Sequence, residues 1–273
     1  MGCGIAEVAA RSGCDVVLRE VNEALVEASQ RRLETSLDTA VRKAKLTTEG
    51  RDAILQRIRF TDSLDELSDC DLVAEAVVED EQTKTAIFAA IGKVVGPDTL
   101  ITSNTSSIPI MKLAAATYKP ERVIGMHFFN PAPVLPLVEI IPCELTSDET
   151  LSRTSEFASD QLGKTIITAK DRAGFVVNAL LIPYLLAALR MVDAGLASAE
   201  DIDKAMVGGC AHPMGPLALT DLIGLDTTVA VAESMYEETK EQLYAPPALL
   251  LRKVEAGNLG RKSGRGFFTY SKS

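Results

Sequence analysis

The chain has 273 residues, of which 47% are hydrophobic and 24% charged, and this length allows one large domain or two modest ones. Its net charge of −10 argues against a nucleic-acid partner, because phosphate binding needs an extended basic surface. The five cysteines are scattered and have no paired short spacing, so we expect neither a disulfide framework nor a metal site. With no apolar run long enough for a membrane span and no cleavable leader, we expect a cytoplasmic protein that does not enter a membrane.

Short β-branched runs alternate with amphipathic stretches over the first two thirds of the chain, which is typical of a parallel sheet covered by helices. We expect strands at 15–19, 59–61, 72–76, 100–103, 123–126, 137–141 and 165–168. We expect helices at 4–12, 23–45, 48–57, 81–95, 108–115 and 148–162. Helical periodicity with Gly and Pro punctuation then runs almost to the end. The sequence therefore predicts a Rossmann-like α/β domain over residues 1–170, with a projecting helix pair at 23–57, and an all-helical domain over residues 171–273.

The first residues are similar to the second half of a dinucleotide-binding turn. Gly2 and Gly4 lead directly into a helix, and Glu20 ends the strand that follows, where such folds hold the adenosine ribose with a carboxylate. A carboxylate there would repel a 2′-phosphate, so NAD is favoured over NADP. The first strand and the first two glycines of the motif are absent from the sequence. The alternative is that the glycines only permit tight helix packing and that Glu20 is a solvated strand end.

His127 and Glu139 are the strongest candidates for acid–base chemistry. His127 closes one apolar strand-like run, and Glu139 interrupts another. A carboxylate inside an apolar strand needs a partner, and an imidazole oriented by a carboxylate is a general base suited to neutral pH. The pair favours a redox or proton-transfer enzyme, with a purely structural ion pair as the alternative.

Six sequence blocks are spread along the chain: AEAVVE at 74–79, SNTSS at 103–107, HFFNP at 127–131, GFVVN at 174–178, HPMGP at 212–216 and GRKSGRGFF at 260–268. In this order they resemble the 3-hydroxyacyl-CoA dehydrogenase family. The resemblance implies an NAD-dependent oxidation of (S)-3-hydroxyacyl-CoA to 3-oxoacyl-CoA, and the reverse reduction, with a short four-carbon acyl chain as the default. It also implies a homodimer formed through the helical domain.

The resemblance also implies roles for individual residues. His127 would be the base and Glu139 its orienting partner, while Ser106 and Asn178 would hydrogen-bond the reacting substrate oxygen. Beyond Gly2, Gly4 and Glu20, the residues expected to contact the cofactor are Glu79, Lys84, Asn104, Asn130 and Lys262. Ser36 and Lys43 are expected to contact coenzyme A, and their spacing of two helical turns places them on one helix face. We expect a structural role for the second histidine, His212, in a turn between helices.

Two alternatives to the enzyme stay open. The chain could be a non-catalytic nucleotide-binding or structural relative of the same fold, which the missing first strand favours and the retained set of Ser106, His127, Glu139 and Asn178 opposes. It could also be a β-hydroxyacid dehydrogenase, a class that uses a lysine where this chain has His127. The His–Glu pair opposes that assignment.

Overall fold

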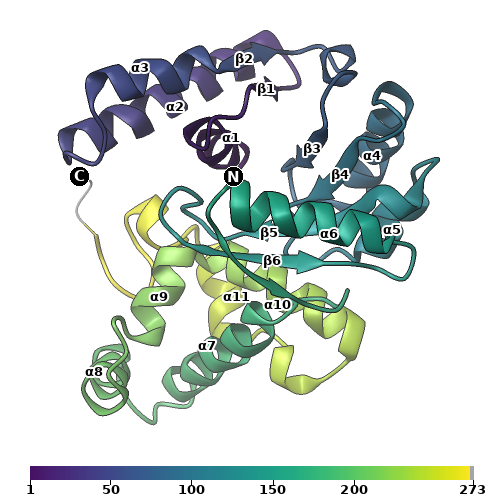
Figure 1. Ribbon diagram of the computed structural model, residues 1–273. Helices are drawn as coiled ribbons and strands as arrows, with labels where there is room; N and C mark the ends of the chain where they lie inside the picture. The colour runs from purple at the N-terminus through teal and green to yellow at the C-terminus, as the bar shows by residue number, and fades with distance from the viewer. Residues whose placement is uncertain (271–273) are drawn as a thin grey trace. The chain divides into compact units, whose positions relative to one another are not determined.

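The computed structural model describes residues 1–270 and divides the chain into two compact units, Met1–Asp171 and Arg172–Ser273 (Figure 1). In the first unit, strands and helices alternate along the chain. In the second, as far as residue 270, the regular elements are helices joined by short turns. No helix among the described residues is long and apolar enough to cross a membrane.

The strands of the first unit are β1 (Val16–Arg19), β2 (Ile58–Thr61), β3 (Leu72–Glu75), β4 (Leu100–Ser103), β5 (Val123–Phe128), β6 (Leu137–Ile141) and β7 (Thr165–Thr168). Its helices are α1 (Gly2–Arg11), α2 (Glu23–Arg42), α3 (Thr48–Gln56), α4 (Glu81–Val94), α5 (Ile110–Ala115) and α6 (Asp148–Glu156). The helices of the second unit are α7 (Val177–Asp193), α8 (Ala199–Cys210), α9 (Pro216–Ile223), α10 (Leu225–Thr239) and α11 (Ala248–Glu255). A single π-helical turn, Phe157–Gln161, continues α6.

The sheet is parallel except for one pair of strands. β3, β4, β5, β6 and β7 lie in that order, and β5 pairs with β6 in antiparallel fashion. The sequence pattern predicts a parallel sheet, and the other strand pairs are parallel. β5 and β6 are antiparallel because the connection over residues 129–136 is too short for a parallel crossover, which needs about a dozen residues or more, usually a helix.

A gap divides the sheet between β1 and β3. Within residues 1–270, β1 pairs with β2 alone, in a separate two-stranded sheet. A cavity of about 1590 Å³ is lined by every residue of β1 and of β3. In a doubly wound sheet the strand that precedes the first helix lies between these two neighbours. The cavity therefore lies where a doubly wound sheet holds the strand that precedes its first helix.

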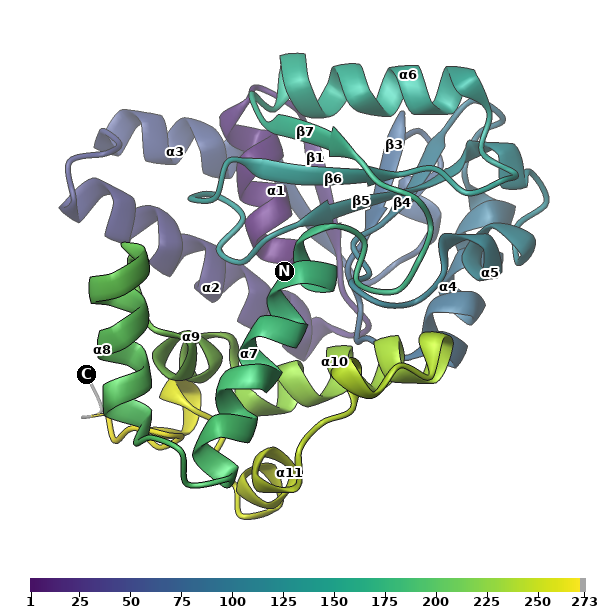
Figure 2. The same cartoon turned by 90° about the horizontal axis from the view of Figure 1, so that it is seen from below.

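Helix α1 packs on two sides inside the first unit. Ala6 and Ala10 face Leu33 and Leu37 of α2, both fully buried. The neighbouring row of α1, which includes Ile5, packs against β5 and β6. Helix α1 thus lies between the α2–α3 pair and the sheet (Figure 2). Its first residue, Gly2, lies beside Ala76, which follows β3.

Asp221 organises the last described part of the second unit. Its carboxylate accepts hydrogen bonds from the amides of Phe267 (2.8 Å) and Phe268 (2.9 Å) and from the hydroxyl of Tyr270 (2.9 Å). A Cβ at Gly260 would come within 2.3 Å of the Asp221 carbonyl, and Gly260 has a φ of +93°. Glycine is required there because both the close approach and the left-handed backbone exclude a side chain.

Candidate active site

His127 and Glu139 lie directly opposite each other on β5 and β6. The Nδ1 atom of His127 is 2.8 Å from Oε2 of Glu139, and the two residues are 5% and 0% exposed. The ring of Phe129 packs edge-on against the imidazole, with centroids 4.7 Å apart. The structure thus brings together the two residues that the sequence singled out. A carboxylate at this distance accepts a hydrogen bond from Nδ1–H and so favours the tautomer that carries the proton on Nδ1.

Ser106 lies in the loop over residues 104–109, between the carboxyl end of β4 and α5, which we call the Ser106 loop. β4 is the parallel neighbour of β5, and the Oδ1 atom of Asn104 accepts a hydrogen bond from the amide of Phe128 at 2.8 Å. Asn104 also donates its own amide to the carbonyl of Glu75 (2.8 Å). Asn104 therefore ties the ends of three neighbouring strands together, and the Ser106 loop and His127 lie at the same edge of the sheet.

Glu79 binds the whole of the Ser106 loop. Its Oε1 atom accepts hydrogen bonds from the Thr105 hydroxyl (2.7 Å) and from the amides of Ser106 (2.8 Å) and Ser107 (3.1 Å). Burial alone would raise the pKa of Glu79, but the Lys84 ammonium and these hydrogen bonds outweigh burial and leave the pKa lowered. Glu79 is therefore a carboxylate at neutral pH.

Lys84 is almost completely buried, at 1% exposed. Its Nζ atom lies 2.6 Å from Oε1 of Glu75 and 3.3 Å from Oε2 of Glu79. The sequence comparison with the family had placed Lys84 and Glu79 at the cofactor and had passed over Glu75. The signal for Glu75 was present, since it is a carboxylate inside an apolar strand in the same way as Glu139.

The residues of the cofactor end surround the N-terminus of α1. Gly2 begins the helix and Glu20 follows β1, and both line the large cavity together with Ala76 beyond β3. The Glu20 carboxylate accepts a hydrogen bond from the hydroxyl of Ser29 at 2.6 Å, which holds it at the strand end. A helix N-terminus and a fixed carboxylate suit the pyrophosphate and the ribose of a dinucleotide. The residues present therefore fit NAD.

Gly4 meets a packing requirement. A Cβ at Gly4 would lie 3.4 Å from the Cβ of Ala132 and 3.5 Å from Cδ of Pro133, in the loop that follows β5. The absence of a side chain lets α1 approach this loop closely. Asn130, in the same loop, is exposed.

The other predicted site residues of the second unit are Asn178 and Lys262, and His212 lies in the same unit. Asn178 lies in the first turn of α7, after Gly174 and Phe175, which both have positive φ. Lys262 forms an ion pair with Asp226 at 2.6 Å. His212 lies in the segment between α8 and α9, and its Nδ1 atom is 3.1 Å from the hydroxyl of Tyr184. This contact agrees with a structural role for His212.

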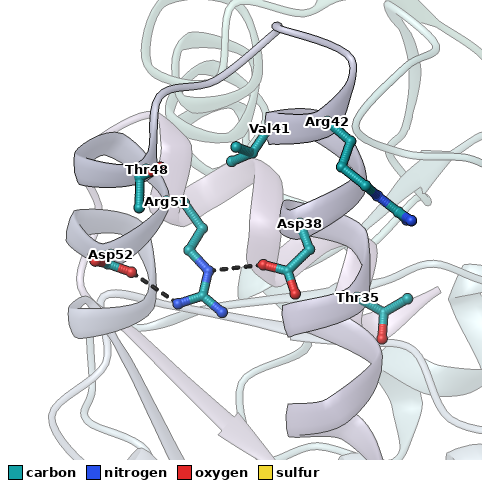
Figure 3. Close-up of a pocket in the computed structure, with 7 residues that line it drawn as sticks. All are labelled: Thr35, Asp38, Val41, Arg42, Thr48, Arg51 and Asp52. Carbon is teal, nitrogen blue, oxygen red and sulfur yellow. Dashed lines mark hydrogen bonds and ion pairs between the residues drawn. The ribbon is translucent and has the colours of Figure 1, made fainter.

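Ser36 and Lys43 are both exposed on α2 or at its C-terminal cap. Between α2 and α3 there is a hollow of about 590 Å³, drawn in Figure 3. Arg51 spans it, with ion pairs to Asp38 (3.0 Å) and Asp52 (2.8 Å). Ser36 and Lys43 do not line this hollow. Arg42, which does line it, donates a hydrogen bond to the hydroxyl of Thr39 at 2.9 Å.

The fold and this edge of the sheet define a Rossmann-type dinucleotide-binding domain joined to a helical domain. Residues 1–172 match the family model for the NAD binding domain of 3-hydroxyacyl-CoA dehydrogenase, and residues 174–270 match the model for its C-terminal domain. The chain belongs to the 3-hydroxyacyl-CoA dehydrogenase family. Its cofactor is NAD.

Individual relatives agree with this assignment. The chain is 58% identical to 3-hydroxybutyryl-CoA dehydrogenase of Mycobacterium tuberculosis, over 99% of this chain and 95% of the relative. It is 40% identical to the mitochondrial hydroxyacyl-coenzyme A dehydrogenase of Homo sapiens, over 99% of this chain and 88% of the relative. The crystal structure of (S)-3-hydroxybutyryl-CoA dehydrogenase from Ralstonia eutropha is similar with a TM-score of 0.93 and 47% identity, over 100% of this chain and 96% of that one.

Proposed function

We propose that this chain oxidises (S)-3-hydroxyacyl-CoA to 3-oxoacyl-CoA with NAD and catalyses the reverse reduction, with 3-hydroxybutyryl-CoA and acetoacetyl-CoA as its substrates. The names of the relatives support the substrate class. The observation that carries the chemistry is the buried His127–Glu139 pair at 2.8 Å. It favours an enzyme over the non-catalytic relative, and a histidine-based reaction over the lysine-based one.

The proposed chemistry needs one proton acceptor at the 3-hydroxyl. When bound, NAD supplies the hydride acceptor for this reaction. In the oxidation, His127 removes the hydroxyl proton through Nε2 while Glu139 holds the proton on Nδ1 and stabilises the imidazolium that forms. In the reduction, the same imidazolium returns the proton to the substrate oxygen.

The other predicted site residues have supporting roles in this proposal. Ser106, and Asn178 from the helical unit, hydrogen-bond the reacting oxygen. Glu20 binds the adenosine ribose, and its negative charge opposes a 2′-phosphate. The remaining predicted cofactor contacts are Gly2, Gly4, Glu79, Lys84, Asn104, Asn130 and Lys262, and the predicted coenzyme A contacts are Ser36 and Lys43.

The substrate assignment is tested by following the loss of NADH absorbance with acetoacetyl-CoA. We expect turnover with acetoacetyl-CoA, much slower turnover with free acetoacetate, and a clear preference for NADH over NADPH. Binding of NAD without turnover of any acyl-CoA would instead support the non-catalytic relative. Equal rates with acetoacetate and acetoacetyl-CoA would contradict the role of coenzyme A.

We also propose a homodimer formed through the helical unit, in the cytoplasm. Large apolar side chains of this unit are exposed in the single chain, among them Leu180 (74%), Leu196 (72%) and Leu222 (50%). Such side chains mark candidate contact surfaces. Sedimentation equilibrium should give twice the chain mass of 29.2 kDa, and a concentration-independent monomer would contradict the dimer.

The five cysteines are free thiols, which supports the proposed location in a reducing compartment.

A further inference from the structure

A network of buried charges lies beneath the Ser106 loop. Glu75, at the carboxyl end of β3, is 3% exposed. Its Oε1 atom accepts hydrogen bonds from Lys84 Nζ (2.6 Å) and from the amide of Val77 (2.7 Å), and its Oε2 atom accepts one from the hydroxyl of Ser103 (2.6 Å). Both oxygens of this carboxylate are therefore bound from different elements.

Two routes lead from Glu75 to the Ser106 loop. Along the first, the hydroxyl of Ser103 donates to Glu75 and accepts a hydrogen bond from the amide of Thr105 at 3.2 Å. Along the second, Lys84 holds Glu79, and Glu79 accepts the amides of Ser106 and Ser107. One buried carboxylate thus fixes both the entry to the loop and its centre.

A buried ion pair is by itself weak evidence for a stabilising role. Burying an ion pair costs desolvation that is repaid only with good geometry, and well-packed apolar residues often serve as well or better. The cluster places two carboxylates around one ammonium, so it also carries a net negative charge. What the network does supply is a single position for the loop backbone, and a misplacement of about 1 Å at a reacting group can lower a rate by roughly 100-fold.

We propose that Glu75 is a positioning residue for the dehydrogenase reaction, acting through Ser103 and through Lys84 and Glu79 to hold Ser106 against the reacting substrate oxygen. This rests on the proposed function. Lys84 and Glu79 belong to the same network, in addition to the contact with the cofactor proposed for them. A change in the network should therefore alter the position of the Ser106 backbone and, through it, the rate of the reaction.

The first test measures the loop and does not depend on activity. Glu75→Gln retains the size of the side chain but removes its charge and one acceptor. In this variant we expect faster hydrogen exchange at the amides of Thr105, Ser106 and Ser107, with exchange in β6 unchanged. The matched control is Glu81→Gln, which breaks an exposed ion pair of α4 with Lys112 (2.7 Å) and should leave the loop as it is. Unchanged exchange at these three amides in Glu75→Gln would overturn the proposal.

The second test is a double-mutant cycle between Glu75→Gln and Ser106→Ala. Alone, Glu75→Gln should lower kcat with acetoacetyl-CoA by about 10- to 100-fold. In the Ser106→Ala background it should lower kcat by less than about twofold, because the two residues act as a unit. Additive losses would show that Glu75 acts elsewhere and would overturn the proposal.

If Glu75→Gln does not fold, Glu79→Gln combined with Ser106→Ala provides the test. Glu79→Gln changes the half-exposed end of the network, and its cycle with Ser106→Ala should show the same non-additivity. An active parent with additive cycles contradicts the positioning role alone. A parent with no turnover of acetoacetyl-CoA contradicts the proposed function itself, and with it the role of the network in a reaction.

Discussion

Glu75 and Glu139 are carboxylates within strands whose neighbouring side chains are apolar, and each has a cation or an imidazole within 2.8 Å. The rule that a buried charge needs a partner predicts both pairings from sequence. The partner of Glu139 could be named, because the chain has only two histidines. The partner of Glu75 could not be named, because Lys84 looks from the sequence like an ordinary helical lysine.

The pKa of Tyr270 offers a test of the Asp221 cluster. Burial, followed by the hydrogen bond and the charge of Asp221, raises the pKa of Tyr270 from its ordinary value of 10.0 to about 12. The folded state therefore favours the neutral phenol, and its contribution to stability is complete below pH 10 and lost as the pH rises towards 12.

Urea unfolding between these two pH values measures this effect. The parent should lose stability more steeply than Tyr270→Phe, which has no proton to lose at this position. Parallel curves for the two proteins would contradict the raised pKa.

At the scale of elements, the strands were predicted well because their apolar runs are self-contained. The ranges 100–103, 137–141 and 165–168 agree residue for residue with β4, β6 and β7. The direction of β6 is set by the short connection before it, and the hydrophobic pattern of a strand does not show that direction.

Helix ends depended on contacts that the local sequence does not show. Helix α5 begins at Ile110 and not at residue 108. The amides of Ile110 (2.7 Å) and Met111 (2.8 Å), the first two of the helix, donate hydrogen bonds to the carboxylate of Asp171, which is distant in sequence. The helix expected over 148–162 is α-helical only to Glu156 and continues as a π-turn. A carboxylate far along the chain and a shift in hydrogen-bond register leave no local signal.

At the scale of the whole molecule, the sequence blocks identify the family more firmly than any single site residue does. Both family models and the full-length relatives agree with them. The gap between β1 and β3 shows what the sequence blocks do not reveal. The motif indicates how a doubly wound sheet begins, whereas the cavity between β1 and β3 is visible only in the structure.

The central claim is that His127 performs the acid–base step, and the chain contains its own matched control in His212. We would measure kcat for acetoacetyl-CoA reduction in the parent, in His127→Gln and in His212→Gln. General acid–base catalysis contributes about 10²- to 10⁴-fold, so His127→Gln should lose activity in that range while His212→Gln keeps most of it. Equal retention of activity in the two variants, with both folded and binding NADH, would contradict the account.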